Sequence, residues 1–195
     1  MFYRPRHCGF TLVELIVAVS VLVILVTVAV PSFQSSLDKR RLIGAAEQVY
    51  SDVQWARGEA VRLNKKIVLT FKNSGTTNWC YGMHDAITPT CDCTASSTTN
   101  CTIGIAPNSV EKKFINSGFR GVSLTLSGFD TNNANYFFCV DSRRGKFFAN
   151  ASCGSDKDGA ISLTSSSGTV KVDMSELGRV RLCSNTGVGG YPSCS

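Results

Sequence analysis

The feature that most constrains this chain is an apolar run from Phe10 to Val30, directly before Pro31. Within these 21 residues the polar positions are Thr11, Glu14, Ser20 and Thr27. At about 1.5 Å rise per residue, the run would form roughly 32 Å of helix, which is enough to cross the hydrocarbon core of a bilayer. The sequence therefore predicts a transmembrane helix over residues 10–30.

A short basic leader, residues 1–9, precedes the run and contains Arg4, Arg6 and His7. In a secretory signal peptide the small residues of the cleavage site follow a shorter apolar core. Here the small residue, Gly9, lies before the apolar run. Cleavage after Gly9 would therefore keep the whole helix in the mature protein and make Phe10 its amino terminus.

Glu14 is an ionisable residue inside the predicted membrane segment. A carboxylate at that depth is unfavourable unless it has a partner. When helices of two subunits pack together, the new amino terminus at Phe10 of one subunit would supply a cation for Glu14 of the other. The alternative is that Glu14 lies close enough to the cytoplasmic edge to stay hydrated.

The residues Gly9 to Glu14, with the sequence GFTLVE, resemble the class III signal of type IV pilins and type II secretion pseudopilins. The resemblance implies that a prepilin peptidase cuts after Gly9 and methylates Phe10. It also implies that Glu14 acts in filament assembly and that Pro31 lies where these helices commonly kink. The implied partners are that peptidase, the inner membrane, and other minor and major pilins or pseudopilins.

The charge distribution predicts the orientation in the membrane. Basic residues of the leader place the amino terminus in the cytoplasm by the positive-inside rule. The part of the chain after Pro31 would then lie in the periplasm of a Gram-negative cell. The net charge of +6 falls to about +4 without Arg4 and Arg6, which is compatible with nucleic acid binding but does not by itself indicate it.

Cysteine usage agrees with an exported domain. Cys8 belongs to the leader, and eight cysteines remain: Cys80, Cys91, Cys93, Cys101, Cys139, Cys153, Cys183 and Cys194. An even number in an oxidising compartment predicts disulfides. Local pairing would join Cys139 to Cys153 and Cys183 to Cys194. Structural zinc is the less favoured reading, because Cys91 and Cys93 are separated by one residue and zinc sites usually have two to four.

The helical period continues beyond Pro31, which should bend the helix without ending it. An apolar stripe with spacings of three and four contains Leu42, Ala46, Val49, Val53, Ala56, Ala60 and Leu63. The residues predicted for the other faces are Lys39, Arg40, Glu47, Gln48, Asp52, Glu59 and Arg62. We therefore expect one long helix over residues 10–63, whose second half packs against a domain.

After Asn64 the pattern becomes that of β-strands. Alternation or strand composition marks residues 67–71, 79–83, 122–126, 136–140, 145–149, 160–163 and 170–172. Turns are expected at 73–75, 130–135 and 155–159, and a loop held by disulfides at 84–102. The predicted fold class is α+β: a long transmembrane helix packed on a β-rich, disulfide-linked domain over 64–195. That domain would be a sandwich or two small sheets against the helix.

The sequence contains no motif that indicates an enzyme, so we predict neither catalysis nor a cofactor. The motifs G-x-S-x-G, G-x-x-x-x-G-K-[ST] and H-E-x-x-H do not occur. His84 is the single histidine after the leader and is expected to be an isolated surface residue. Asp156 and Asp158 faintly resemble a calcium loop, but the remaining ligand positions are missing. A turn without metal is the expected structure there.

The carboxyl end contains Gly178-Arg179-Val180-Arg181. In a strand, Arg179 and Arg181 would point to one face and Val180 to the other. Arginine suits phosphate because its planar fork donates two parallel hydrogen bonds and stays charged. A strand with one solvated face is the alternative. Residues that would widen a basic surface, if folding brings them near, are Lys112, Lys113, Arg143, Arg144 and Lys146.

The order of signal, long helix, β-rich domain and terminal G-R-x-R resembles the GspH/FimT family of minor pilins and pseudopilins. Some FimT-like members bind DNA through G-R-x-R, matched here by Gly178, Arg179 and Arg181. The leading hypothesis is a minor pilin near the tip of a type IV pilus that primes assembly. A second is a receptor for double-stranded DNA in natural transformation, and a third is a type II secretion pseudopilin acting in protein export.

Overall fold

The computed structural model describes residues 9, 11–85, 91–95, 101–104, 109–132, 135–148, 158–175 and 177–194. Within these residues, one long helix, α1 (Leu12–Leu63), is followed by twelve strands and a short 3₁₀ helix, η1 (Val188–Gly190). The chain divides into two compact units, residues 1–37 and 38–195. Helix α1 runs from the first unit into the second.

The first unit is the apolar part of α1. Thr11 caps its first turn, since the Thr11 hydroxyl accepts a hydrogen bond of 3.2 Å from the amide of Glu14. Side chains from Leu12 to Val30 are exposed, and the most apolar window has a mean hydropathy of 2.9. The helix continues through Pro31. By length and composition it is able to cross a membrane.

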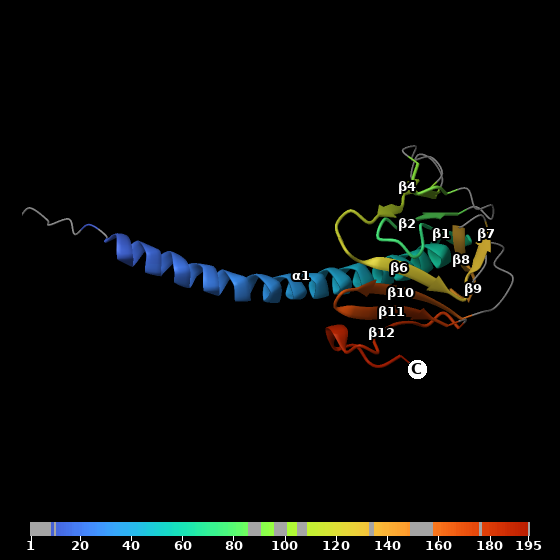
Figure 1. Ribbon diagram of the computed structural model, residues 1–195. Coiled ribbons are helices and arrows are strands. Elements are labelled where there is room, and N and C mark those ends of the chain that lie inside the picture. Colours follow the sequence, from blue (N-terminus) through green and yellow to red (C-terminus); the bar gives the residue numbers. More distant parts are fainter. Residues whose placement is uncertain are drawn as a thin grey trace, which may run out of the picture. The chain divides into compact units, whose positions relative to one another are not determined.

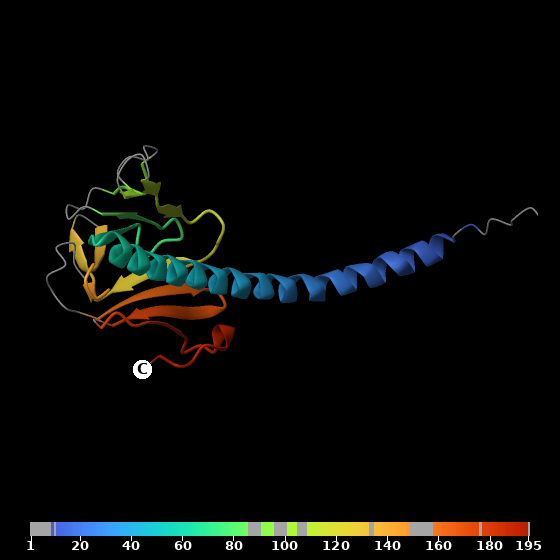
Figure 2. The ribbon, with the colours of Figure 1, turned by 180° about the vertical axis from the view of Figure 1, so that it is seen from behind.

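The second unit begins with the remainder of α1, residues 38–63. Its buried residues are Leu42, Ala45, Ala46, Val49, Asp52, Val53, Ala56 and Ala60. Four of them are alanine, and such short side chains let the strands approach the helix closely. Two views of opposite sides show this part of α1 first behind and then in front of the strands (Figures 1 and 2). It therefore packs against one side of the β-structure.

A six-stranded antiparallel sheet has the order β5-β2-β1-β8-β7, with β9 also paired to β8. Its strands are β1 (Ile67–Lys72), β2 (Cys80–His84), β5 (Lys113–Ile115), β7 (Asp130–Asn132), β8 (Asn135–Val140) and β9 (Phe147–Phe148). Alternation along β1 sends Ile67, Leu69 and Phe71 into the main core. Val68 and Thr70 belong to the opposite face, which is buried as well.

A four-stranded antiparallel sheet has the order β12-β11-β10-β6. Its strands are β6 (Ser123–Ser127), β10 (Gly159–Ser165), β11 (Gly168–Met174) and β12 (Val180–Cys183). A third, two-stranded sheet joins β3 (Thr102–Ile103) to β4 (Val110–Glu111). Leu124, Ile161 and Val172 of the four-stranded sheet share one hydrophobic core with the helix and β1.

Most of the predicted elements are present, and the structure differs from the sequence-based expectation at the following places. Residues 130–132 form strand β7 and not a turn. The short strands β3, β4 and β5 were not predicted. Asp52 was placed on a solvated face of the helix, but it is buried at 5% exposure. It lies three residues after Val49 and four before Ala56, which puts it on the same helical face as both.

Candidate functional site

The amino-terminal candidate site is the first turn of α1. Gly9 is exposed, and Phe10 lies outside the described residues. Glu14 occupies the third helical position after its cap, Thr11, where the helix dipole favours a negative charge. The carboxylate that the sequence assigns to filament assembly is thus exposed in the first turn of an apolar helix.

The other polar residues of the apolar segment satisfy their own hydrogen bonds. The Ser20 hydroxyl donates to the carbonyl of Val17, and the Thr27 hydroxyl donates to that of Ile24, each at 2.8 Å. A hydroxyl bonded in this way can enter lipid without leaving a donor unpaired. The segment is therefore suited to a membrane and equally to packing among other helices.

The carboxyl-terminal candidate site is the turn that contains Gly178. This glycine is buried and has a φ of 83°, a left-handed conformation that a residue with a Cβ adopts at a cost. A Cβ added there would lie 2.6 Å from the carbonyl oxygen of Gly145 and 3.2 Å from a guanidinium nitrogen of Arg57. Gly178 therefore brings two turns and the helix together, and its role in the motif is structural.

The two arginines of the motif have different surroundings. Arg179 is exposed just before β12. Arg181 makes an ion pair of 2.9 Å with Asp173, its register partner on β11. Both arginines line an open groove of about 430 Å³. Its other lining residues are Asp158, Asp173, Met174, Ser175 and Leu177. The groove thus contains two guanidinium groups and two carboxylates.

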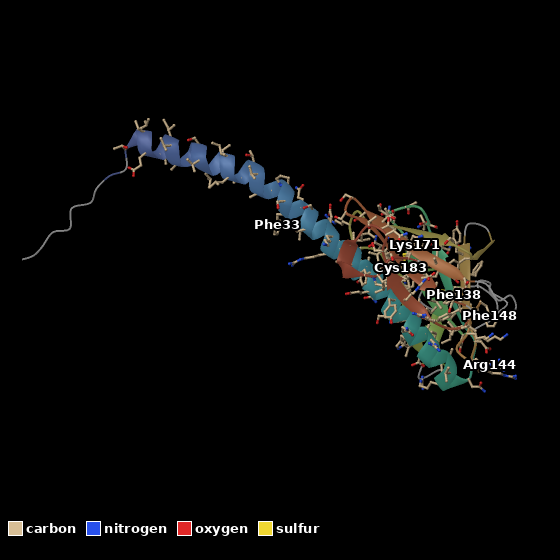
Figure 3. The ribbon with its side chains drawn as sticks, turned by 90° about the horizontal axis from the view of Figure 1, so that it is seen from below. Phe33, Phe138, Arg144, Phe148, Lys171 and Cys183 are labelled. Carbon is tan, nitrogen blue, oxygen red and sulfur yellow. A yellow bond between two sulfur atoms is a disulfide. The ribbon has the colours of Figure 1, made fainter. Side chains whose placement is uncertain are left out.

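Only part of the predicted basic surface assembles around this turn. Arg143 and Arg144 are exposed and directly precede Gly145, which contacts the Gly178 turn. Figure 3 shows Arg144 near the carboxyl end of α1, consistent with the contact between Arg57 and Gly145. By contrast, Lys113 is on β5, at the opposite edge of the six-stranded sheet from β8 and β9.

Lys112 is paired with a buried carboxylate and does not contribute to the basic surface. Its ammonium group is 3.0 Å from a carboxylate oxygen of Asp52 and lies 4.8 Å from the centre of the Trp55 ring. Lys113 forms a 3.5 Å ion pair with Glu111. These contacts remove both lysines from the predicted cationic surface.

Two disulfides lie against strand β2 of the six-stranded sheet. Disulfides join Cys80 to Cys93 and Cys91 to Cys101. The second lies against Gly82, where a Cβ would meet both sulfur atoms. A hydrogen bond and ion pair from Lys72 lower the pKa of the Asp92 carboxyl to about 2. The segment 91–95 is therefore fixed to β2 through Cys93 and to β1 through Asp92, and Cys91 joins it to Cys101.

The carboxyl-terminal cysteines pair as the sequence suggests. Cys183 of β12 and Cys194 form a disulfide, which ties the end of the chain to the sheet. Figure 3 labels Cys183 beside Lys171, its register partner on β11. Cys139 is also disulfide-bonded. Cys153, its expected partner, lies outside the described residues.

His84 is not the surface residue that the sequence suggested. It is 2% exposed, and among the described residues neither ring nitrogen has a hydrogen-bond partner. Burial lowers the pKa of its imidazole, and the nearby Asp85 carboxylate raises it by less. Within the described residues, no three His, Cys, Asp or Glu side chains are grouped so as to hold a metal ion. Asp156 lies outside those residues, and Asp158 is exposed.

Two family models match this chain, one at its amino-terminal segment and one over the domain that follows. Residues 4–30 match the prokaryotic N-terminal methylation motif. Residues 45–191, three quarters of the chain, match the family model of the type II transport protein GspH. The chain belongs to the GspH family. The family model therefore covers the last part of α1, from residue 45, and all of the described strands, with the Gly178 turn included.

Solved structures give a more distant likeness. Two crystal forms of the type IV minor pilin FimU from Pseudomonas aeruginosa are similar to this chain. The first is 14% identical, covers 73% of this chain and 88% of that chain, and has a TM-score of 0.42. The second is 15% identical, with coverages of 72% and 91% and a TM-score of 0.40. No curated protein sequence matches the chain.

The G-R-x-R motif was evident from the sequence, but the residues that contact it in the fold were not. Arg57 and Gly145 are far from Gly178 in the chain, and no local pattern indicates that the three meet. Asp173 alternates with Val172 and Met174 on β11, so its outward position was predictable. Its pairing with Arg181 required the register between β11 and β12.

Proposed function

We propose that this chain is a minor subunit of a type IV pilus. A prepilin peptidase cleaves after Gly9 and methylates Phe10, and the apolar part of α1 anchors the mature chain in the bacterial inner membrane. The domain after residue 37 lies in the periplasm until the subunit leaves the bilayer and joins a filament with other pilins. It acts near the filament tip and primes assembly without catalysing a reaction.

The observation that carries this proposal is the coincidence of the methylation motif with a fully exposed apolar helix. A cleaved signal peptide would leave no such helix, and a helix in the core of a soluble protein would be buried. The disulfides of the second unit suit an oxidising compartment. Membership of the GspH family is consistent with assembly among pilins or pseudopilins.

The alternative is a pseudopilin of type II secretion, because the same helix and domain would serve that filament. Deletion of the gene followed by complementation separates the two machines. Loss of surface pili with normal protein secretion supports the pilus subunit. Loss of secretion with intact pili supports the pseudopilin, and no change in either would contradict both.

Binding of double-stranded DNA during natural transformation is a second candidate function. The exposure of Arg179 beside the turn with Arg143 and Arg144 favours it. Contacts of this kind would be made to phosphates, would not read the base sequence, and would weaken steeply with salt. The pairing of Arg181 with Asp173 leaves Arg179 as the better candidate of the two.

Fluorescent duplex DNA titrated at several salt concentrations tests this second function. Arg179→Ala should weaken binding, and Arg181→Ala should add less. Arg120→Ala, at another exposed arginine, is the matched control. Absence of binding at low salt, or an equal loss with the control variant, would rule out a specific DNA site at Arg179.

A further inference from the structure

The two disulfides within residues 80–101 are interleaved along the chain. Cys80 pairs with Cys93, and Cys91 pairs with Cys101. Four cysteines allow three connectivities, and this is the one in which the two disulfide loops cross. The simplest alternative joins consecutive cysteines, Cys80 to Cys91 and Cys93 to Cys101. Because Asp92 alone separates Cys91 from Cys93, both of these cysteines are within reach of the same partners.

Consecutive pairing is favoured before the domain folds. Its loops are each shorter than the native ones by about two residues, which favours the consecutive set roughly twofold. Export from the membrane helix onward would also bring Cys80 and Cys91 to the oxidising side before Cys93 and Cys101. Strands β5 and β8, which flank the β1–β2 pair in the sheet, follow all four cysteines in the chain. Oxidation can therefore precede the sheet that would select the native pairs.

The folded sheet accepts the native pairing and encloses it. Alternation places Cys80 and Gly82 on the same face of β2, about 7 Å apart. A Cβ added at Gly82 would meet the sulfur atoms of Cys91 and Cys101, so the two disulfides lie side by side on this strand. All four cysteines are at most 3% exposed. The native disulfides are therefore closed to an attacking thiolate, and any exchange must be complete before they are buried.

Correction of a consecutive pairing needs a thiolate from outside the chain. Disulfides rearrange when a thiolate attacks a disulfide sulfur. Eight cysteines follow Gly9, and when all eight are paired the mature chain has no thiolate of its own. Rearrangement without a catalyst takes minutes to hours. The interleaved connectivity therefore favours an enzyme that supplies the thiolate.

We propose that this chain is a substrate of a disulfide isomerase, which converts a consecutive pairing of these four cysteines into the interleaved one. The inference rests on the proposed function, because it requires an exported domain. It adds the class of enzyme that acts on the domain before the subunit assembles. The substrate is the segment 80–101 before the sheet encloses it.

The exchange conserves both disulfides. The isomerase thiolate attacks the Cys91 sulfur, which breaks the Cys80–Cys91 bond, forms a mixed disulfide with Cys91 and releases the Cys80 thiolate. That thiolate attacks the Cys93 sulfur, forms the Cys80–Cys93 bond and releases the Cys101 thiolate. The Cys101 thiolate then attacks Cys91 of the mixed disulfide, forms the Cys91–Cys101 bond and returns the isomerase thiolate. Two disulfides are present before and after, so no oxidant or reductant is consumed.

Disulfide mapping of the full-length chain tests the proposal in matched strains with and without the periplasmic isomerase. After alkylation without reduction, a protease that cuts before aspartate gives one peptide with Cys80, one with Cys91, and one with both Cys93 and Cys101. Native pairing joins all three peptides, whereas consecutive pairing joins two and leaves the third closed on itself. Thermolysin, which cuts between Cys93 and Cys101, then assigns the links. We expect the native links to fall about threefold without the isomerase, as loop closure alone predicts. An equal yield in both strains would overturn the proposal.

The chain supplies two controls for the effect of interleaving. Cys183 and Cys194 are consecutive cysteines at a sequence separation of 11, close to the 13 and 10 of the interleaved pairs, and their disulfide should form equally in both strains. In the variant Cys80→Ser/Cys93→Ser, the second disulfide of the segment has no competitor there and should form without the isomerase. Continued dependence on the isomerase in this variant would overturn the proposal.

A purified exchange separates this inference from the proposed function. The mature chain is oxidised with diamide in denaturant, transferred to detergent micelles, and incubated with a catalytic amount of isomerase. The native links should rise about threefold, whereas an isomerase with serine in place of its active-site cysteine should give no rise. No rise with the active isomerase, or an equal rise without it, would overturn the inference. A chain that is fully reduced in cells would instead contradict the exported location, and the purified exchange would still decide the inference.

Discussion

The hydroxyl of Tyr81 donates a hydrogen bond of 2.6 Å to a carboxylate oxygen of Asp52 inside the core. Gln48 and Lys112 contact the same carboxylate at 3.0 Å. Burial raises the pKa of the Tyr81 hydroxyl well above its usual value, and the charge of Asp52 raises it further. Tyr81 therefore remains a donor at any physiological pH and fixes β2 to the helix.

Removal of the Asp52 carboxylate should strongly destabilise the second unit. Asp52→Ala leaves Lys112 and Tyr81 without their partner, and we expect a loss of about 3 kcal/mol. Tyr81→Phe removes one hydrogen bond to a charged group and should lose about 1.5–3 kcal/mol. Urea unfolding of a fragment of residues 38–195 measures both. Ser51→Ala, at the exposed neighbour, is the control, and equal midpoints for all three variants would contradict this account.

Gly82 is expected to be essential for the disulfide above it. In Gly82→Ala the new methyl group would occupy the position of the Cys91 sulfur. Mass spectrometry after alkylation without reduction should then show free thiols at Cys91 and Cys101. Gly58→Ala is the matched control, because nothing lies within 4 Å of a Cβ at that helical position. It should keep all thiols oxidised and raise stability by about 0.5–1 kcal/mol. Full oxidation in Gly82→Ala would show that the loop does not need this close approach.

The glycine of G-R-x-R should act on stability and its first arginine should not. Gly178→Ala combines left-handed strain with the contact to Gly145, and we expect a loss above about 1–2 kcal/mol. Gly187→Ala has a similar φ of 69° but open space around its Cβ, so it isolates the strain. Arg179→Ala should stay within about 0.5 kcal/mol of wild type. A thermal unfolding series in which Gly178→Ala and Gly187→Ala coincide would argue against the packing role.

His84 should make the second unit sensitive to acid. Because burial lowers its pKa in the folded state, the unfolded chain binds a proton more readily, so stability is full above about pH 6.5 and falls as pH decreases below it. The slope approaches about 1.4 kcal/mol per pH unit until the folded-state pKa is reached. The fragment 38–195 has His84 as its single histidine. Urea midpoints between pH 7.5 and 5.0 should fall in wild type and remain nearly level in His84→Phe; parallel slopes would refute the assignment.

The long elements were predictable because their periods are sustained. The stripe from Leu42 to Ala60 indicated the buried face of the helix, and the alternation along β1 indicated the face in the main core but not the burial of its opposite face. Strands of two or three residues, such as β3 and β5, are too short for a period to emerge. Asp52 lies on the buried face by its spacing from Val49 and Ala56, but Tyr81 and Lys112, which pair with its carboxylate there, are distant in the chain.

The candidate site was predictable in type but not in geometry. Alternation predicted the outward side chain of Arg181, which lies in β12, whereas Arg179 lies just before the strand and is exposed there. Whether Arg181 is free to bind a ligand depends on the strand register, which places it opposite Asp173. Gly178 and Gly145 lie in turns that belong to two different sheets. A contact between turns so far apart in the chain cannot be predicted from a local sequence pattern. The bend proposed at Pro31 stays a prediction.

The most direct test of the central claim is the fate of Glu14→Ala in cells. The account predicts that this variant is still cleaved after Gly9 and methylated on Phe10, but is missing from sheared filaments because its carboxylate cannot pair with a neighbouring amino terminus. Mass spectrometry of the amino terminus and immunoblotting of the filament fraction measure the two steps. Wild-type amounts of Glu14→Ala in purified filaments would contradict the account.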